Sequence, residues 1–323
     1  MKQKLFYLPL ILFSLFAINI SSAGDIAFTS DRAGNLDIYI IDTNGEHLIN
    51  LTEHGADDYS PTWSPDGRFI AYVSERDGNP EIYVIELNTK EQRRLTDDKA
   101  TDLDPAWSPD GSTIAFASNL GRDHAADTDI YTMDTNGKKV QKLTSKGGHN
   151  SNPTWSPDGE WIAFRSTQDG IGGIHVMTAE GEKQEALTQV SATHPAWGPN
   201  GKEICFSSEA LGGVATPTLF TVDTDGKKVQ KLTDGTLASE DPSWAPDGQS
   251  IVFVSIADGS LYVIKAAGGD PRQLTDDLGL DFSPEWAPTA FSVSPRSNMQ
   301  LMQWGVLKRS TRVKNYSQQF VVQ

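Results

Sequence analysis

The stretch that decides the fold is PTWSPDGRFIAYVS, residues 61–74, which joins a tryptophan, a tight turn and an alternating apolar run. Proline presets φ at the first corner of a type I turn, and Gly67 can take the left-handed conformation that closes a bulged hairpin. Asp66 can accept a hydrogen bond from the backbone that follows it. The stretch therefore predicts a β-hairpin whose aspartate builds the turn and is not a catalytic group.

This pattern occurs six times along the chain. The tryptophans, spaced 44, 48, 42, 47 and 42 residues apart, are Trp63, Trp107, Trp155, Trp197, Trp244 and Trp286. A Leu-Thr pair also recurs six times, at residues 51–52, 95–96, 143–144, 187–188, 232–233 and 274–275. Each repeat holds four short strand patterns, and Asn-Gly or Asp-Gly pairs separate the last two in several repeats, which is typical of a two-residue hairpin turn. Such repeats predict propeller blades, with each tryptophan filling the space between adjacent blades.

The order of the landmarks predicts how the ring closes. The first repeat begins with IAFTS at residues 26–30 and has no tryptophan segment before it, whereas the segment around Trp286 has no Leu-Thr after it. One blade is thus divided between the two ends of the propeller, and pairing them removes the open sheet edges. We therefore expect an all-β, six-bladed propeller over residues 24–290, with the N-terminal and C-terminal strands paired.

The segments outside the repeats have different characters. Residues 1–23 combine Lys2 and Lys4, an apolar run and a small-residue end at Ala23, which is typical of a cleaved secretory signal peptide. An uncleaved membrane anchor is the alternative, although the run is short for a bilayer span. After cleavage no transmembrane segment is expected. Residues 291–323 break the repeat pattern and predict a basic tail, either a short helix or disordered. The single cysteine, Cys205, is expected to be a buried small hydrophobe.

Charge narrows the classes of partner. The formal net charge is −16, although residues 289–323 hold five basic residues and no acidic one. The propeller is therefore even more acidic than the total, which disfavours nucleic acid or an anionic membrane surface as a direct partner. Cations, or proteins with basic patches, are better candidates for the partner. We expect the chain, after removal of its signal peptide, to be a periplasmic or secreted monomer.

The repeated residues resemble a known family. WSPDG followed by IAY or IAF, then an IY strand and a terminal LT, is similar to the Pro-Asp-Gly repeat of TolB-type propellers, relatives of the WD repeats. The resemblance covers residues 25–288 and implies a six-bladed, non-catalytic propeller that binds other envelope proteins. TolB itself has an α/β domain ahead of its propeller, whereas here the first blade strand follows the predicted cleavage site closely, so the resemblance concerns the propeller alone.

Two classes of enzyme contain similar propellers. Prolyl-oligopeptidase-like proteins carry similar repeats but need a Gly-x-Ser-x-Gly elbow, which this sequence lacks. Pectate-degrading lyases hold a metal in a propeller channel, and His54, His149 and His194 precede three tryptophan strands at different offsets. His175 falls where other blades have an aromatic residue and is expected to fill that place. A metal-dependent lyase or hydrolase at the channel mouth is therefore the alternative to a binding scaffold.

The strongest functional prediction comes from position. The first strand of each blade should line the channel, so the residue three before each tryptophan should lie near one mouth, and all six are polar: Ser60, Asp104, Asn152, His194, Asp241 and Ser283. Asp58, Asp102 and Glu240 lie just upstream and add oxygen atoms. Such a rim suits calcium, another divalent cation or a cationic ligand. The alternative is a hydrated channel mouth whose polarity only avoids burying unpaired groups.

Two hairpin segments and one set of loops remain. The segments DTNGEH, residues 42–47, and DTDGKK, residues 223–228, look faintly like calcium loops but lack the length and the terminal glutamate of an EF-hand, so hairpin turns explain them. The glycine-rich loops between second and third strands should open on the same face as the polar rim. Their longer members are where recognition could reside.

Overall fold

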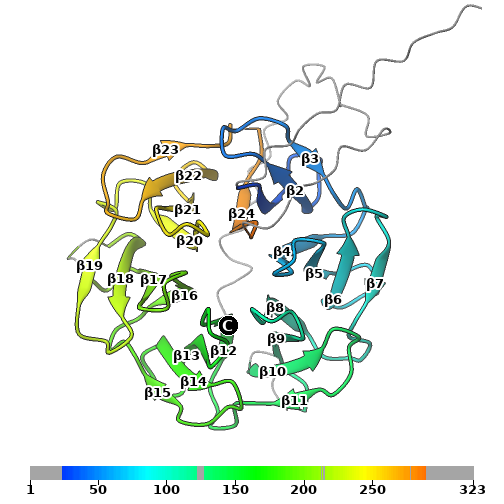
Figure 1. Cartoon of the computed structure of the whole chain (residues 1–323), viewed down its shortest axis with the longest axis horizontal. Helices are drawn as coiled ribbons and strands as arrows, with labels where there is room; N and C mark the ends of the chain where they lie inside the picture. The colour runs from blue at the N-terminus through cyan, green and yellow to red at the C-terminus, as the bar shows by residue number, and fades with distance from the viewer. Residues whose placement is uncertain (1–23, 122–126, 212, 214, 277, 289–323) are drawn as a thin grey trace, which may run out of the picture.

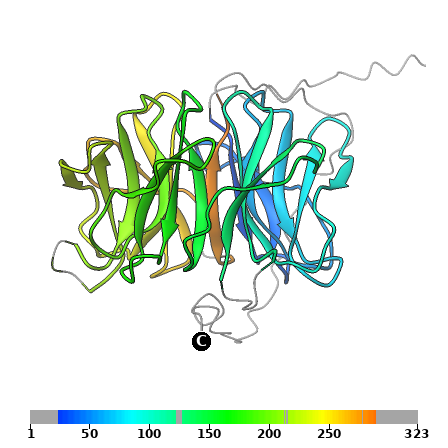
Figure 2. The ribbon, with the colours of Figure 1, turned by 90° about the horizontal axis from the view of Figure 1, so that it is seen from below.

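The computed structural model describes residues 24–121, 127–211, 213, 215–276 and 278–288. The predicted signal peptide and the predicted basic tail lie outside these residues. The described chain forms a ring of six four-stranded antiparallel sheets (Figure 1), which confirms the expected all-β, six-bladed propeller. Seen from the side, the strands run between two faces of the ring (Figure 2). The part of the chain that the structure describes contains no helix long and apolar enough to cross a membrane.

The blades follow one another in sequence order around the ring. Blade 1 consists of β24 (Asp281–Trp286), β1 (Ile26–Ser30), β2 (Asp37–Ile41) and β3 (Ile49–Asn50). Blade 2 consists of β4 (Asp58–Trp63), β5 (Phe69–Ser74), β6 (Glu81–Glu86) and β7 (Gln92–Arg94). Blade 3 consists of β8 (Asp102–Trp107), β9 (Thr113–Ser118), β10 (Asp129–Asp134) and β11 (Gln141–Lys142).

The second half of the ring repeats this order. Blade 4 consists of β12 (Asn150–Trp155), β13 (Trp161–Ser166), β14 (Gly173–Thr178) and β15 (Glu185–Ala186). Blade 5 consists of β16 (Thr193–Trp197), β17 (Glu203–Ser208), β18 (Thr218–Asp223) and β19 (Val229–Lys231). Blade 6 consists of β20 (Ser239–Trp244), β21 (Ser250–Ser255), β22 (Ser260–Lys265) and β23 (Arg272–Gln273).

Blade 1 closes the ring. Its sheet order is β24-β1-β2-β3, so the last described strand pairs with the first, as the divided repeat predicts. Ile26 lies opposite Trp286 in this antiparallel pair, and Ala27 lies opposite Glu285. The pairing covers both edges that the two ends of the propeller would otherwise leave open. The first strand of every blade lies nearest the axis of the ring (Figure 1).

The Trp-Ser-Pro-Asp-Gly segments form the predicted turns. Gly67 has a φ of 67°, and its N–H donates to the Ser64 carbonyl. The Asp66 carboxylate accepts hydrogen bonds from the Ser64 hydroxyl and the Arg68 backbone N–H, which confirms its structural role. The indole N–H of Trp63 donates to the carbonyl of Glu285 in the neighbouring blade at 3.2 Å. The tryptophan thus occupies the space between blades, as expected.

The turns between third and fourth strands differ from the prediction. In Asp42–Glu46 the Gly45 N–H donates to the Asp42 carbonyl, and the Asp42 N–H donates to the Glu46 carbonyl. Gly45 has a φ of 84°, whereas Asn44 is not left-handed, so this is a longer loop than the expected two-residue turn. A Cβ on Gly45 would lie 2.5 Å from the Leu274 carbonyl oxygen of blade 6. Close contact between blades therefore also explains the glycine.

The Leu-Thr landmark has one physical cause in all six blades. The threonine hydroxyl accepts a hydrogen bond from the backbone N–H of a residue near the start of the third strand, fourteen positions earlier. The leucine N–H donates to the carbonyl of that same residue. The threonines are buried and the leucines point into the core. Each pair thus fastens the outermost strand to its blade with one apolar and one polar contact.

Apolar side chains pack within blades and between neighbouring blades. One cluster, for example, joins Ala27 and Ile38 of blade 1 to Trp63 and Ile70 of blade 2. Cys205 is fully buried in a similar cluster, which confirms the expectation for it. Burial of this kind around the whole ring makes every blade depend on two neighbours.

The threonine contact can be tested in blade 5. Changing Thr233 to valine keeps the shape of the side chain but leaves the buried Leu219 N–H without its acceptor. Such an unpaired group costs about 1–3 kcal/mol of unfolding free energy. Urea denaturation should show this loss for Thr233→Val and little change for Thr224→Val, since Thr224 is exposed. Equal stability of both variants would contradict the assignment.

Candidate functional site

Six equivalent residues surround the axis of the propeller, and we call them the axial ring. They are the residues predicted from their position three before each tryptophan: Ser60, Asp104, Asn152, His194, Asp241 and Ser283. All six have left-handed backbone conformations, with φ between 45° and 53°, and all six are half-buried. Each also lies at a break in the strand register between first and second strands. The six residues therefore share one backbone position in the repeat, and their role in binding a ligand stays a prediction.

The backbone explains part of the polarity of the axial ring. Left-handed φ is uncommon for residues other than glycine, and asparagine, aspartate and histidine tolerate it best. A proline follows every ring residue, beginning with Pro61 and ending with Pro284. Proline disfavours the right-handed helical region for the residue before it. Polar types at these positions thus have a structural cause as well as a chemical use.

Hydrogen bonds join ring residues across neighbouring blades. Asp241 lies between two partners: its Oδ1 forms an ion pair with His194 Nε2 at 2.9 Å, and its Oδ2 accepts from the Ser283 backbone N–H at 3.2 Å. On the other side of the ring, Asp104 Oδ2 accepts from the Asn152 backbone N–H at 3.0 Å. The ring is therefore an organised polar surface.

The ion pair sets the charge of this part of the ring. Burial disfavours the imidazolium, but Asp241, Glu240 and Asp104 outweigh it and raise the pKa of His194 to about 9. Burial also opposes ionisation of Asp241, yet His194 and Ser283 lower the pKa of that carboxyl. Burial raises the pKa of Asp104. At neutral pH His194 is thus positive beside Asp241, which weakens the attraction of this sector for a cation.

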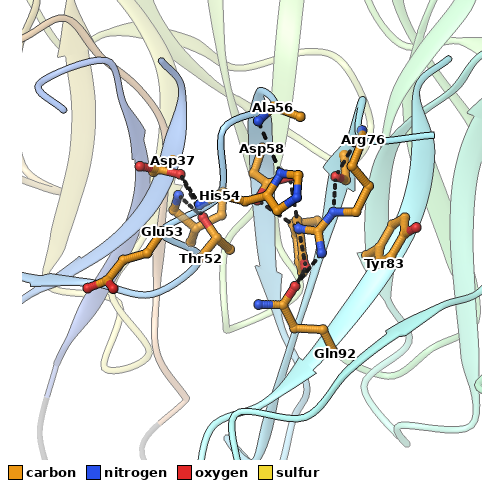
Figure 3. A network of polar contacts seen from close by, with 12 residues as sticks. Asp37, Thr52, Glu53, His54, Ala56, Asp58, Arg76, Tyr83 and Gln92 are labelled. Atoms are coloured by element: carbon orange, nitrogen blue, oxygen red, sulfur yellow. Dashed lines mark hydrogen bonds and ion pairs between the residues drawn. The ribbon is translucent and has the colours of Figure 1, made fainter. Parts of the chain in front are cut away.

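The three upstream acids occupy different environments. Glu240 is half-buried next to Asp241, and its pKa is raised mainly by burial. Asp58 is fully buried, and Arg76 Nη2 donates to its Oδ2 at 3.0 Å. Figure 3 shows Arg76 held between Asp58 and Gln92, with the ring of Tyr83 beside it. The carboxylate of Asp58 therefore fastens a loop inside blade 2 and does not contribute to an open rim, contrary to the expectation.

Asp102 is buried as well but lacks a comparable partner. Within the described residues neither of its carboxylate oxygens has a hydrogen-bond partner. Burial raises its pKa to about 6, against the opposing effect of the nearby Ser118 and Thr96 hydroxyls. Arg32 and Arg76 pair with the equivalent acids of blades 1 and 2, whereas blade 3 has Leu120 at that position. Within the described residues Asp102 therefore lacks the arginine that its equivalents in blades 1 and 2 have, and the Ser118 and Thr96 hydroxyls favour its ionised form.

Three of the described histidines, His54, His149 and His175, have contacts outside the axial ring. His54 Nδ1 accepts from the Ala56 N–H in an exposed loop, and His149 Nδ1 lies 3.0 Å from the Thr128 hydroxyl. His175 packs 5.8 Å from the ring of Phe164, so it fills the aromatic place as predicted. Among the described residues, the one grouping of three with metal-ligand geometry is Asp42, Glu46 and His47, away from the axis.

Sequence reasoning missed Glu285. The residue before the tryptophan is small in five repeats (Thr62, Ala106, Thr154, Ala196 and Ser243) and is a glutamate only in the last. Its Oε2 accepts from the Trp63 backbone N–H at 2.9 Å and its Oε1 from the Thr62 hydroxyl at 3.3 Å. Burial raises the pKa of Glu285 to about 8, although these contacts lower it. Glu285 thus ties the closing strand β24 to β4.

The loops between second and third strands open on the same face as the start of the first strands. Backbone bonds show this: the Asp58 N–H donates to the Leu36 carbonyl, and the Asp102 N–H donates to the Pro80 carbonyl. We call this the mouth face, formed by residues 31–36, 75–80, 119–121, 167–172, 256–259 and the segments that enter the first strands. Exposed large apolar side chains of this face are Leu120, Ile171, Ile256 and Leu278. Exposed apolar side chains therefore lie on the same face of the propeller as the polar axial ring.

Comparison with known proteins supports the resemblance seen in the repeats. A family model described as "TolB beta propeller domain" matches residues 20–89 and 75–245. The Tol-Pal system protein TolB of Anaeromyxobacter dehalogenans is 34% identical over 110 residues, which cover 33% of this chain and 24% of that protein. An uncharacterized peptidase of Bacillus subtilis is 29% identical over 110 residues, covering 32% of this chain and 17% of that protein. The matches thus span a quarter or less of these curated relatives.

A solved structure is similar over a longer range. The crystal structure of TolB from Acinetobacter baumannii has a TM-score of 0.73 and 26% sequence identity. The match covers 82% of this chain and 67% of that chain. The propeller as a whole, and not one blade, is therefore what the two proteins share.

Within the described residues Asp102 has no arginine partner, which leads to a prediction for the variant Leu120→Arg. The Leu120 N–H donates to Ser118 Oγ as the Arg76 N–H does to Ser74 Oγ, so the backbone already has the geometry seen in blade 2. A guanidinium there should pair with Asp102 and raise the unfolding free energy by about 1–3 kcal/mol. Thermal and urea denaturation would measure this. Leu120→Gln is the uncharged control, and an equal gain in both variants would refute the pairing.

The raised pKa of Glu285 yields a prediction for pH dependence. Because the folded-state pKa, about 8, lies above the ordinary value of 4.5, folding favours the protonated acid. Its contribution to stability is present below pH 4.5 and is lost as the pH rises through 8. Glu285→Gln removes this loss, so the variant should gain stability relative to the natural chain between pH 5 and pH 9. Urea denaturation midpoints of both proteins at pH 5 and pH 9 test this prediction. A difference in stability between the two proteins that is the same at both pH values would argue against a neutral Glu285.

Proposed function

Because the chain belongs to the TolB β-propeller family, we propose that it is an exported, non-catalytic scaffold that binds a protein partner of the cell envelope on its mouth face. The signal-like residues 1–23 support export, and the similarity to TolB supports a periplasmic or secreted location. The acidic charge favours a protein partner over nucleic acid. The axial ring and the surrounding loops form the proposed contact surface.

The observation that carries this proposal is the exposure of large apolar side chains on the mouth face. Ile171 and Ile256 are each 50% exposed and Leu278 is 60% exposed, all on the mouth face. Four of the six exposed large apolar side chains among the described residues lie on this face: Leu120, Ile171, Ile256 and Leu278. Apolar groups beside polar ones are typical of surfaces that bind proteins. These side chains come from different blades, so a partner could contact several loops at once. The ring supplies directional hydrogen bonds in the middle of this surface.

His194 adds a specific requirement for the partner. Its Nε2 is engaged by Asp241, whereas within the described residues its buried Nδ1 has no hydrogen-bond partner. A protonated imidazole donates from both nitrogens. The proposed partner therefore supplies a carbonyl or carboxylate oxygen at the axis. This need for an acceptor favours recognition by a protruding loop or chain end over a bound cation.

Paired substitutions test the mouth face. Ile171→Ser with Ile256→Ser should reduce recovery of the partner from an envelope extract about tenfold or more, because buried apolar anchors carry most of the binding energy. Full-length protein serves as bait, and quantitative mass spectrometry compares the captured proteins.

The matched control removes apolar groups elsewhere. Val140→Ser with Val229→Ser changes side chains of nearly equal exposure, 47% and 48%, beside the outer strands of blades 3 and 5. This control should capture the same partner at the natural level. Full capture by the isoleucine variant, or equal losses in both variants, would rule out the mouth face as the contact surface.

A further inference from the structure

The hairpin between β2 and β3 carries an unusual group of side chains. Asp42, Glu46 and His47 each offer one ligand atom, and these atoms lie within 4.8 Å of one another. Asp42 Oδ1 accepts from the Asn44 and Glu46 backbone N–H groups, so it builds the turn. Its other oxygen, Oδ2, lies 2.8 Å from His47 Nδ1. One carboxylate oxygen thus holds the loop while the other faces an imidazole.

The same hairpin in other blades shows that the turn does not require these residues. In blade 3, Asp134 accepts the equivalent backbone bonds, but Lys138 and Lys139 replace the glutamate and the histidine. Lys139 and His47 have nearly the same φ, 55° and 56°. Lys139 Nζ lies 3.8 Å from Asp134 Oδ2, an ordinary surface ion pair. Blade 1 therefore replaces a lysine pair with metal-ligating groups on an unchanged backbone.

A buried acid beside the hairpin provides an independent observation. Ile26 lies opposite Ile41, so Asp25 and Asp42 occupy the next opposed positions, with both side chains on one face of the sheet. Asp25 is only 6% exposed, and no hydrogen bond to its carboxylate exists within the described residues. In blade 3 the uncharged Thr113 lies opposite the turn aspartate Asp134. In blade 5 the acid Glu203 lies opposite Asp223, but Lys227 and Lys228 of that loop supply positive charge beside Asp223. Blade 1 has opposed acids without such lysines in its loop.

We propose that Asp42, Glu46 and His47 form a binding site for a divalent first-row transition-metal ion, with the buried carboxylate of Asp25 beside them. Two opposed carboxylates, one of them buried and unpaired, repel each other unless a cation or a proton lies between them. Carboxylate oxygens alone would suit calcium or magnesium, whereas an imidazole nitrogen selects for zinc and its neighbours. Zinc accepts this mixed set of nitrogen and oxygen ligands, usually four in number.

The location gives the site a structural consequence. Gly45 of this hairpin packs against the Leu274 carbonyl of blade 6, and Arg272 donates to the Thr43 carbonyl at 2.8 Å. The hairpin therefore contacts the next blade at the position where the ring closes. A metal bound there joins β1, β2 and the turn, and stabilises this junction because it binds the folded chain preferentially.

The test is titration of the full chain, freed of metals by a chelator, with Zn²⁺ in the presence of a competing chromogenic chelator. The natural chain should show one saturable site and a rise in melting temperature. Asp25→Asn should weaken the site about tenfold or more, as loss of a supporting or ligating group does at other metal sites. Excess Ca²⁺ should not displace Zn²⁺.

The matched control exchanges the two hairpins' residues. The double variant His47→Lys with Lys139→His keeps the number of histidines and lysines, and lysine already occupies this backbone conformation in blade 3. It should fold, as circular dichroism will verify, and lose the site. Equal Zn²⁺ affinity in the double variant or in Asp25→Asn would overturn the proposal, as would displacement by Ca²⁺ or absence of saturable binding to the natural chain.

Discussion

The left-handed residue near the start of each first strand is the constraint on which the rest of this propeller depends. Six residues with φ near 50° interrupt the pairing of the innermost strands at the same place in every blade. Such a conformation costs free energy for residues with a side chain, and it persists only where the surroundings enforce it. Here the break in strand register at the same place in every blade accompanies it. The same backbone feature thus recurs at the six axial-ring residues, several of which bond to one another across neighbouring blades.

Departures from the repeat identify the residues with roles beyond the fold. Glu285 stands where other blades have small residues, Leu120 where two blades have arginine, and His47 where blade 3 has lysine. Each change alters the electrostatics of one position while the backbone of the blade stays the same. In a protein of repeated units the other blades act as internal references, because they show what the fold alone requires. Comparison of equivalent positions in different blades distinguishes polar residues that the fold requires from polar residues with another role. The burial of a residue alone makes this distinction less well.

The fold could be predicted from the sequence because its signals are local and repeated. The turn at Asp66 and Gly67 and the fourteen-residue separation of the threonine bond both lie within one repeat. Position in the repeat also picks out six residues that share one backbone conformation. The charge pairings could not be predicted, because they do not recur in every repeat. Asp58 meets Arg76 within blade 2, and Asp241 sets the protonation of His194 from the next blade. Glu285 can be recognised in the sequence, because it is a single large acid at a position where the other five repeats have small residues.

The arrangement of the mouth face constrains the partner that we propose for it. Interfaces commonly place apolar groups at the centre and polar groups at the rim. Here the order is reversed, since the axial ring is polar and the exposed Ile171, Ile256 and Leu278 belong to loops farther from the axis. A flat apolar surface would leave the buried His194 Nδ1 without an acceptor, at a cost comparable to a lost hydrogen bond to a charged group. A partner that fits must therefore reach the axis with an oxygen atom and cover the surrounding loops with apolar groups. This requirement is more selective than the area of the face alone, because it fixes both the position and the chemistry of the central contact.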